Sequence, residues 1–95
     1  MIVERRTYKA KEQQEMVYLI QAEMKAVGPD IVSRIYMPMI APLSVIVHEM
    51  EFKDLAAREA FWAKWREKRS TPAFWEKWRE AYGEGGNVEI WTLAD

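Results

Sequence analysis

The chain opens with side chains that alternate between the two sides of an extended backbone. Over residues 2–8, one side carries Ile2, Glu4, Arg6 and Tyr8. A strand has this period of two, so the stretch predicts a first β-strand. From Lys11 to Val27 the apolar residues recur every three or four positions instead. That spacing predicts an amphipathic helix, which Gly28 and Pro29 end.

Two apolar runs follow, over residues 31–40 and 43–52, and they are rich in isoleucine, valine and methionine. The link between them, Ala41–Pro42, is short. Runs of this composition around a short link predict a β-hairpin.

Capping signals mark two further helices. Asp54 is the expected N-cap of a helix that runs to about Arg69. Thr71 followed by Pro72 repeats the signal for a short helix that ends at Gly83. The segment GEGG then predicts a linker, and NVEIWTL, residues 87–93, predicts a last strand.

The order strand, helix, strand, strand, helix pair, strand is that of an α+β, ferredoxin-like split βαβ fold with a four-stranded antiparallel sheet. Its second helix is followed by an extra short helix, and its strand order is 4-1-3-2. Pro38 suits an edge position for the second strand, because proline lacks the amide hydrogen that a central strand donates. With 95 residues, the chain is expected to be a single domain over residues 1–95.

Composition narrows the function classes. The net charge is −1, so no overall field attracts nucleic acid, and there is no cysteine for disulfides, thiolate chemistry or cysteine-held metals. The longest uncharged run is shorter than a membrane span and is interrupted by prolines. Charges at the start of the chain do not fit a signal peptide. We expect a soluble cytoplasmic protein with no membrane or nucleic-acid partner.

The stretch FWAKWREKRSTPAFWEKWRE, residues 61–80, holds four of the five tryptophans. Pro72 divides it into two helices, each with an aromatic stripe, and Leu55, Trp62 and Trp65 form the first stripe. Core packing is the favoured interpretation, and lining of a ligand site by one or two indoles is the alternative. Stacking on nucleic acid is disfavoured, because acidic residues alternate with the basic ones.

Two charged residues fall inside apolar stripes. Arg58 lies within the stripe of the later helix, and Glu23 falls among the apolar residues of the earlier one. A lone buried charge costs several kcal/mol, so Arg58 is expected either to pair with Glu23 or to bind an anionic ligand. The alternative is that both long side chains reach the solvent at the rim.

His48 is the only histidine and lies on the predicted third strand. It is the candidate catalytic residue, since a neutral imidazole serves as a general base or as an axial haem ligand. The alternative is a packed, hydrogen-bonded side chain. The chain has no G-x-S-x-G context, no phosphate-binding glycine loop and no H-x-x-E-H cluster, so no metal site and no cofactor are expected.

Three segments together resemble the NIPSNAP family, within the dimeric α+β barrel group. They are VERRTY (residues 3–8), IAPLSVIVHEMEFKDLAAREA (residues 40–60) and TPAFWEKW (residues 71–78). The matching positions include Glu4, Arg6, Thr7, Tyr8, Pro42, Leu43, His48, Phe52, Arg58 and Glu59.

The resemblance implies a homodimer whose two sheets face each other, with a cavity between sheet and helices in each subunit. It settles no reaction, because the group includes cofactor-independent monooxygenases, haem-degrading enzymes and isomerases beside members of unknown role. We expect a small-molecule-binding domain whose pocket is lined by Trp62, Trp65 and His48, with Arg58 as the polar anchor. The alternatives are an oxygenase in which His48 removes a phenolic proton, and an assembly module without a ligand.

Overall fold

The computed structural model of the chain describes residues 1–40, 44–68 and 72–94. Its elements are β1 (Ile2–Ala10), α1 (Gln13–Val27), β2 (Ser33–Tyr36), β3 (Val45–Phe52), α2 (Leu55–Lys68), α3 (Pro72–Ala81) and β4 (Tyr82–Thr92). The four strands form one antiparallel sheet in the order β2-β3-β1-β4. This order confirms the predicted ferredoxin-like α+β fold with its extra short helix. The predicted link at Ala41–Pro42 and the predicted cap at Thr71 lie outside the described residues.

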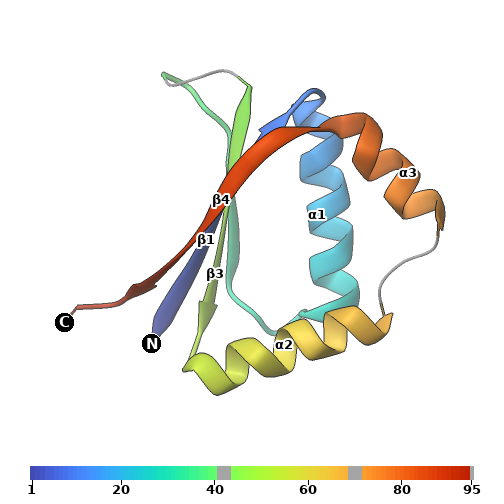
Figure 1. Ribbon diagram of the computed structural model, residues 1–95. Helices are drawn as coiled ribbons and strands as arrows, with labels where there is room; N and C mark the ends of the chain where they lie inside the picture. Colours follow the sequence, from blue (N-terminus) through green and yellow to red (C-terminus); the bar gives the residue numbers. More distant parts are fainter. Residues whose placement is uncertain (41–43, 69–71, 95) are drawn as a thin grey trace.

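The helices α1, α2 and α3 all lie on one side of the sheet, and the opposite side is bare of described elements (Figure 1). The core lies between these two layers. β3 buries every second side chain, and Ile46 and Met50 are fully enclosed. The apolar stripe of α1 packs against them through Met16, Val17, Leu19, Ile20 and Val27. The spacing of apolar residues in the sequence, every second residue in β3 and every three or four residues in α1, therefore matches the spacing of the buried side chains.

β1 occupies the centre of the sheet, paired with β3 on one side and β4 on the other. Arg6 lies directly opposite His48, and Glu4 lies opposite Met50. Because Met50 and His48 are buried under the helices, the side of β1 that carries Glu4, Arg6 and Tyr8 faces the helices as well. The side of β1 that carries two charged residues, Glu4 and Arg6, therefore faces the interior of the protein.

α2 begins with the predicted cap, since Asp54 Oδ1 accepts the backbone N–H of Ala57 at 2.8 Å. The predicted apolar stripe is wrong at Leu55, which is 58% exposed. Leu55 lies in the first turn, beyond the end of β3 (Figure 1). Phe61, about two turns later, is buried in the core, and Trp62 and Trp65 pack against the same cluster.

β4 begins five residues earlier than predicted, at Tyr82 rather than Asn87, so the GEGG segment is strand and not a linker. Glycine makes this pairing possible. Gly86 has a φ of +133°, and a Cβ there would lie 2.4 Å from the carbonyl oxygen of Thr7. The backbones of β1 and β4 approach more closely at this point than any other residue allows.

β2 is shorter than predicted and ends at Tyr36. Pro38 lies just beyond it, where a proline cannot donate to a further ladder hydrogen bond. The edge position of β2 is confirmed. Within the described residues, no helix combines the length and the apolar character that crossing a membrane requires.

Candidate functional site

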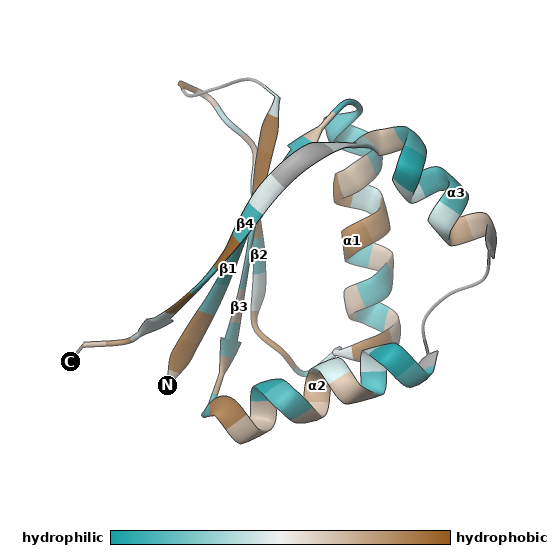
Figure 2. Cartoon of the chain, viewed as in Figure 1, coloured by the Kyte–Doolittle hydropathy of each residue, from teal (hydrophilic) through white to brown (hydrophobic). Residues whose placement is uncertain are grey.

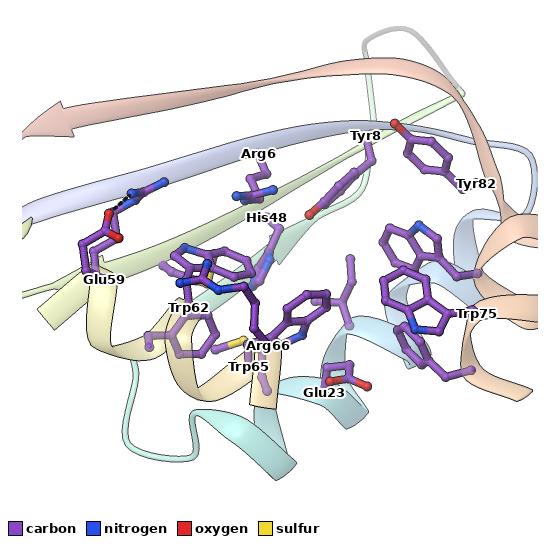
Figure 3. Close-up of a pocket in the computed structure, with 17 residues that line it drawn as sticks. Arg6, Tyr8, Glu23, His48, Glu59, Trp62, Trp65, Arg66, Trp75 and Tyr82 are labelled. Atoms are coloured by element: carbon purple, nitrogen blue, oxygen red, sulfur yellow. Dashed lines mark hydrogen bonds and ion pairs between the residues drawn. The ribbon is translucent and has the colours of Figure 1, made fainter. Parts of the chain in front are cut away.

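A cavity of about 610 Å³ lies between the sheet and the helices. Side chains of β1 and β3 form its floor, and α1, α2 and α3 supply its walls (Figure 3). The structure brings all the candidates named from the sequence into this lining, namely Arg58, Trp62, Trp65, His48 and Glu23. They come from three separate elements, so only the tertiary fold makes them neighbours.

The walls are aromatic. Trp62 and Trp65 of α2 meet edge to face with ring centroids 5.7 Å apart, and Trp65 meets Trp75 of α3 in the same way at 5.9 Å. Trp78 continues the line by stacking on Tyr82 at 5.7 Å. These rings are half buried and line the cavity, and all of them except Trp75 also pack against the core. The near repeat in the sequence is therefore two helices whose aromatic faces meet.

Glu4 lies beneath this wall and is fully buried, with 0% exposure. Its carboxylate accepts hydrogen bonds from Arg6 Nε at 2.7 Å, from Trp62 Nε1 at 3.2 Å and from Arg58 Nε. Sequence reasoning did not name Glu4 as a site residue. The alternation along β1 placed it beside Arg6, but a single strand does not reveal which of its sides faces the helices.

Arg58 reaches the centre of the sheet rather than the rim. Its Nε–H goes to Glu4, and its Nη1 donates to Glu59 at 2.8 Å. These two glutamates hold the guanidinium, in place of the pairing with Glu23 that the sequence indicated. Glu23 faces the same cavity from α1. The rim interpretation of Arg58 is wrong, because the side chain is only 19% exposed.

Arg6 lies over the ring of Trp62, with its Cζ 4.3 Å from the ring centroid. Burial alone would lower the pKa of Arg6, but the hydrogen bond to Glu4 and the neighbouring Tyr8 raise it. Burial alone would raise the pKa of Glu4, but the hydrogen bonds from Arg6 and Arg58 hold it below its ordinary value. At neutral pH the cluster therefore holds two guanidinium cations around one buried carboxylate.

His48 and Tyr8 complete the polar part of the floor. His48 is 4% exposed, and its Nε2 shares a 2.7 Å hydrogen bond with Ser33 Oγ. Burial and the charge of Arg6 lower the pKa of His48 to about 4, so the imidazole is neutral. Burial raises the pKa of Tyr8, which keeps its hydroxyl protonated as a hydrogen-bond donor. In the described residues, no group of three histidine, aspartate or glutamate side chains is placed to hold a metal ion.

Comparisons with known proteins support the fold. No protein-family model matches the chain, and no curated protein sequence does either. A NIPSNAP family protein with unknown function from Agrobacterium tumefaciens shares 23% identity and superposes with a TM-score of 0.77, over 99% of this chain and 88% of that chain. A second NIPSNAP family protein from the same organism is 23% identical and superposes with a TM-score of 0.78, over 99% of this chain and 86% of that chain.

A more distant match is SnoaB, a cofactor-independent oxygenase from Streptomyces nogalater. It is 12% identical with a TM-score of 0.68, over 99% of this chain and 93% of that chain. At these identities the matches establish a shared fold. The chain therefore has the fold of solved NIPSNAP family structures, as the resemblance in its residues predicted.

Proposed function

We propose that this chain binds a small molecule, with an apolar body and an anionic end, in the cavity between sheet and helices. The observation that carries the proposal is the pairing of aromatic walls with a cation on the floor of a cavity of about 610 Å³. Ligand sites in proteins are concave and mostly apolar, and a few polar groups fix the orientation. The volume lies within the range of such sites, roughly 300 to 1,000 Å³.

The charge distribution supports an anionic end. Arg58 is held by Glu4 and by Glu59, whereas Arg6 shares Glu4 with it. The buried part of the cluster thus carries one more cation than anion, since Glu59 is largely exposed. An anion beside Arg6 would balance this excess.

The second candidate is a cofactor-independent oxygenase. SnoaB carries that activity on the same fold, and His48 and Tyr8 line the cavity here. In that mechanism His48 would take a phenolic proton, and the apolar walls would shelter the anion while oxygen reacts. A pKa of about 4 makes His48 a weak base toward a phenol, so binding remains the leading proposal. Neither function requires a cofactor.

The third candidate, an assembly module without a ligand, is disfavoured by the volume of the cavity. Assembly itself belongs to the proposal, because we expect a cytoplasmic homodimer. Several apolar side chains are exposed in β4 and just after it, namely Val88, Ile90, Trp91 and Leu93. Hydrophobic residues also lie at the ends of β1 and β4 next to the termini (Figure 2). Trp91 lies opposite Val3 on the bare face of the sheet, and a second copy laid against that face would cover it.

Titration calorimetry and fluorescence with an anionic naphthalene dye, 1-anilinonaphthalene-8-sulfonate, test the binding site. We expect saturable binding of one dye per chain. Met24→Trp, which places a larger side chain in the lining, should weaken it by roughly tenfold or more. Tyr18→Trp on the exposed face of α1 is the matched control and should bind as the wild type does.

Absence of saturable binding, or equal binding by Met24→Trp and the wild type, would rule out this cavity as the site. Oxygen consumption with quinol substrates distinguishes the second candidate. Turnover that disappears in His48→Ala would establish the oxygenase, and no turnover would leave the binding function.

A further inference from the structure

The polar part of the cavity is small and has a definite geometry, which specifies the ligand more closely. Arg6 and His48 lie directly opposite each other on β1 and β3, and Tyr8 lies two residues beyond Arg6 on the same face. Figure 3 shows the three side chains converging on one part of the cavity. A guanidinium, a phenolic hydroxyl and a neutral imidazole therefore form one polar patch. The rest of the lining is mainly aromatic and aliphatic, with Glu23, Arg58, Glu59 and Arg66 among it. We take the patch on the floor as the place of the polar end of a ligand.

The charge of this patch limits the charge of the ligand. Arg6 and Arg58 share the single buried carboxylate of Glu4, and Arg58 has Glu59 in addition. Because Glu59 is largely exposed, the buried groups are two guanidiniums and one carboxylate, and one added negative charge balances them. A dianion, such as a phosphate monoester, would leave a negative charge in excess beside Glu4, which is itself fully buried.

The shape of the donors favours a planar acceptor. Arg6 donates its Nε–H to Glu4 and also hydrogen bonds with the hydroxyl of Tyr8, and a guanidinium has five N–H donors, so it has further N–H groups to offer a ligand. A guanidinium fork matches the two oxygens of a carboxylate in one plane. The protonated hydroxyl of Tyr8 lies next to it as a further donor. A carboxylate satisfies this arrangement, whereas a phenolate offers a single oxygen.

The walls select the body of the ligand. Trp62, Trp65 and Trp75 meet edge to face at 5.7 and 5.9 Å, and flat rings continue such contacts, whereas alkyl chains do not. We infer that the ligand is an aromatic monocarboxylate whose carboxylate binds Arg6 and whose ring lies against the indoles. This inference rests on the proposed function and adds the ligand class to it.

Calorimetry with four matched compounds tests the ligand class in the unmodified protein. They are 2-naphthoate, its neutral isostere 2-naphthamide, 2-naphthyl phosphate, and decanoate as the alkyl carboxylate. We expect 2-naphthoate to bind at least roughly tenfold more tightly than each of the others. Equal affinity for the amide would overturn the role of Arg6. Tighter binding of the phosphate would overturn the monoanion, and tighter binding of decanoate would overturn the aromatic body.

Two arginine variants locate the carboxylate. Arg6→Met should lower the affinity for 2-naphthoate by roughly tenfold or more and leave 2-naphthamide within about twofold. Arg34→Met removes an arginine that pairs with Glu51, and its affinities should be unchanged.

If Arg6→Met does not fold, the ratio of the affinities of the wild type for 2-naphthoate and 2-naphthamide decides alone. Binding of the dye without any preference for 2-naphthoate would overturn the ligand class while the proposed function stands, and failure of all five compounds would refute both.

Discussion

Arg58, on α2, donates its Nε–H to Glu4, which lies 54 residues earlier in the centre of the sheet. One turn further along α2, Trp62 donates to the same carboxylate oxygen at 3.2 Å. A single buried glutamate thus fixes the position of the helix that forms one wall of the cavity. It also holds Arg6, the cation on the floor, at 2.7 Å. The ion pairs of Glu4 therefore also determine the shape of the candidate site.

Glu4→Gln tests how much the fold depends on this carboxylate. The amide keeps the shape of the side chain but removes the negative charge between two guanidiniums. Breaking a buried ion pair costs roughly 3 to 5 kcal/mol, and we expect about 3 kcal/mol because both arginines retain some contact with water. The free energy of unfolding from urea denaturation is the measurement. Glu76→Gln, on the exposed face of α3, is the control and should stay within about 0.5 kcal/mol of the wild type.

If Glu4→Gln is as stable as Glu76→Gln, then water or other groups stabilise Arg6 and Arg58 as well as the carboxylate of Glu4 does. The same variant also separates stability from binding. Because Glu4→Gln removes the buried anion beside Arg6 and Arg58, it should strengthen the binding of 2-naphthoate relative to that of 2-naphthamide. A parallel loss for both compounds would point to a general disturbance of the cavity instead.

The fold was predictable because the order of its elements depends on local signals. The change of period after β1, the cap at Asp54 and the break at Pro72 each act within a few residues. Glu4 was not predictable as a site residue, because its importance comes from contacts with Arg58 and Trp62 more than fifty residues away. The lining by Trp62 was foreseen, since its stripe must face the sheet in any split βαβ fold. The early start of β4 was not predicted, because glycines usually mark a linker. Here they permit a close approach of the β1 and β4 backbones.

His48 gives the fold a dependence on pH between neutral and mildly acidic conditions. Its pKa falls from 6.5 to about 4 on folding, so the unfolded chain binds more protons than the folded chain within that window. Stability therefore decreases as the pH falls from about 6.5 toward 4. We expect a loss of about 2 kcal/mol between pH 7 and pH 5, measured by urea denaturation. The lowered pKa of Glu4 acts in the same direction, but only below its unfolded value of 4.5.

His48→Gln isolates this contribution, because glutamine does not titrate and can still hydrogen bond with Ser33. Its absolute stability will differ from that of the wild type. Its stability should nevertheless change by less than about 0.5 kcal/mol between pH 7 and pH 5. A full pH dependence that persists in His48→Gln would assign the protons to other groups and would contradict a neutral His48.

Gly86 is expected to tolerate substitution less well than Gly83, the glycine near the start of β4. Its φ is positive, and a Cβ added there would approach the Thr7 carbonyl oxygen to 2.4 Å, so alanine has no unstrained position. Gly86→Ala should cost roughly 2 kcal/mol or more in unfolding free energy. Gly83→Ala is the matched control, because a Cβ there would lie 3.1 Å from the backbone of Lys9 without a positive φ. If the two variants lose the same stability, the close pairing at Gly86 is not the constraint.

Trp91 provides the test of the homodimer. It is 55% exposed, and it lies opposite Val3 on the side of the sheet that the helices leave bare. If a second copy covers this face, the wild type should sediment as a dimer at micromolar concentration. Trp91→Lys should then weaken association by roughly tenfold or more, because it places an ammonium group in an apolar interface. Tyr18→Lys, on the outer face of α1, is the control and should leave the dimer intact. Sedimentation of Trp91→Lys with the dissociation constant of the wild type would show that the chain associates through another surface or stays a monomer.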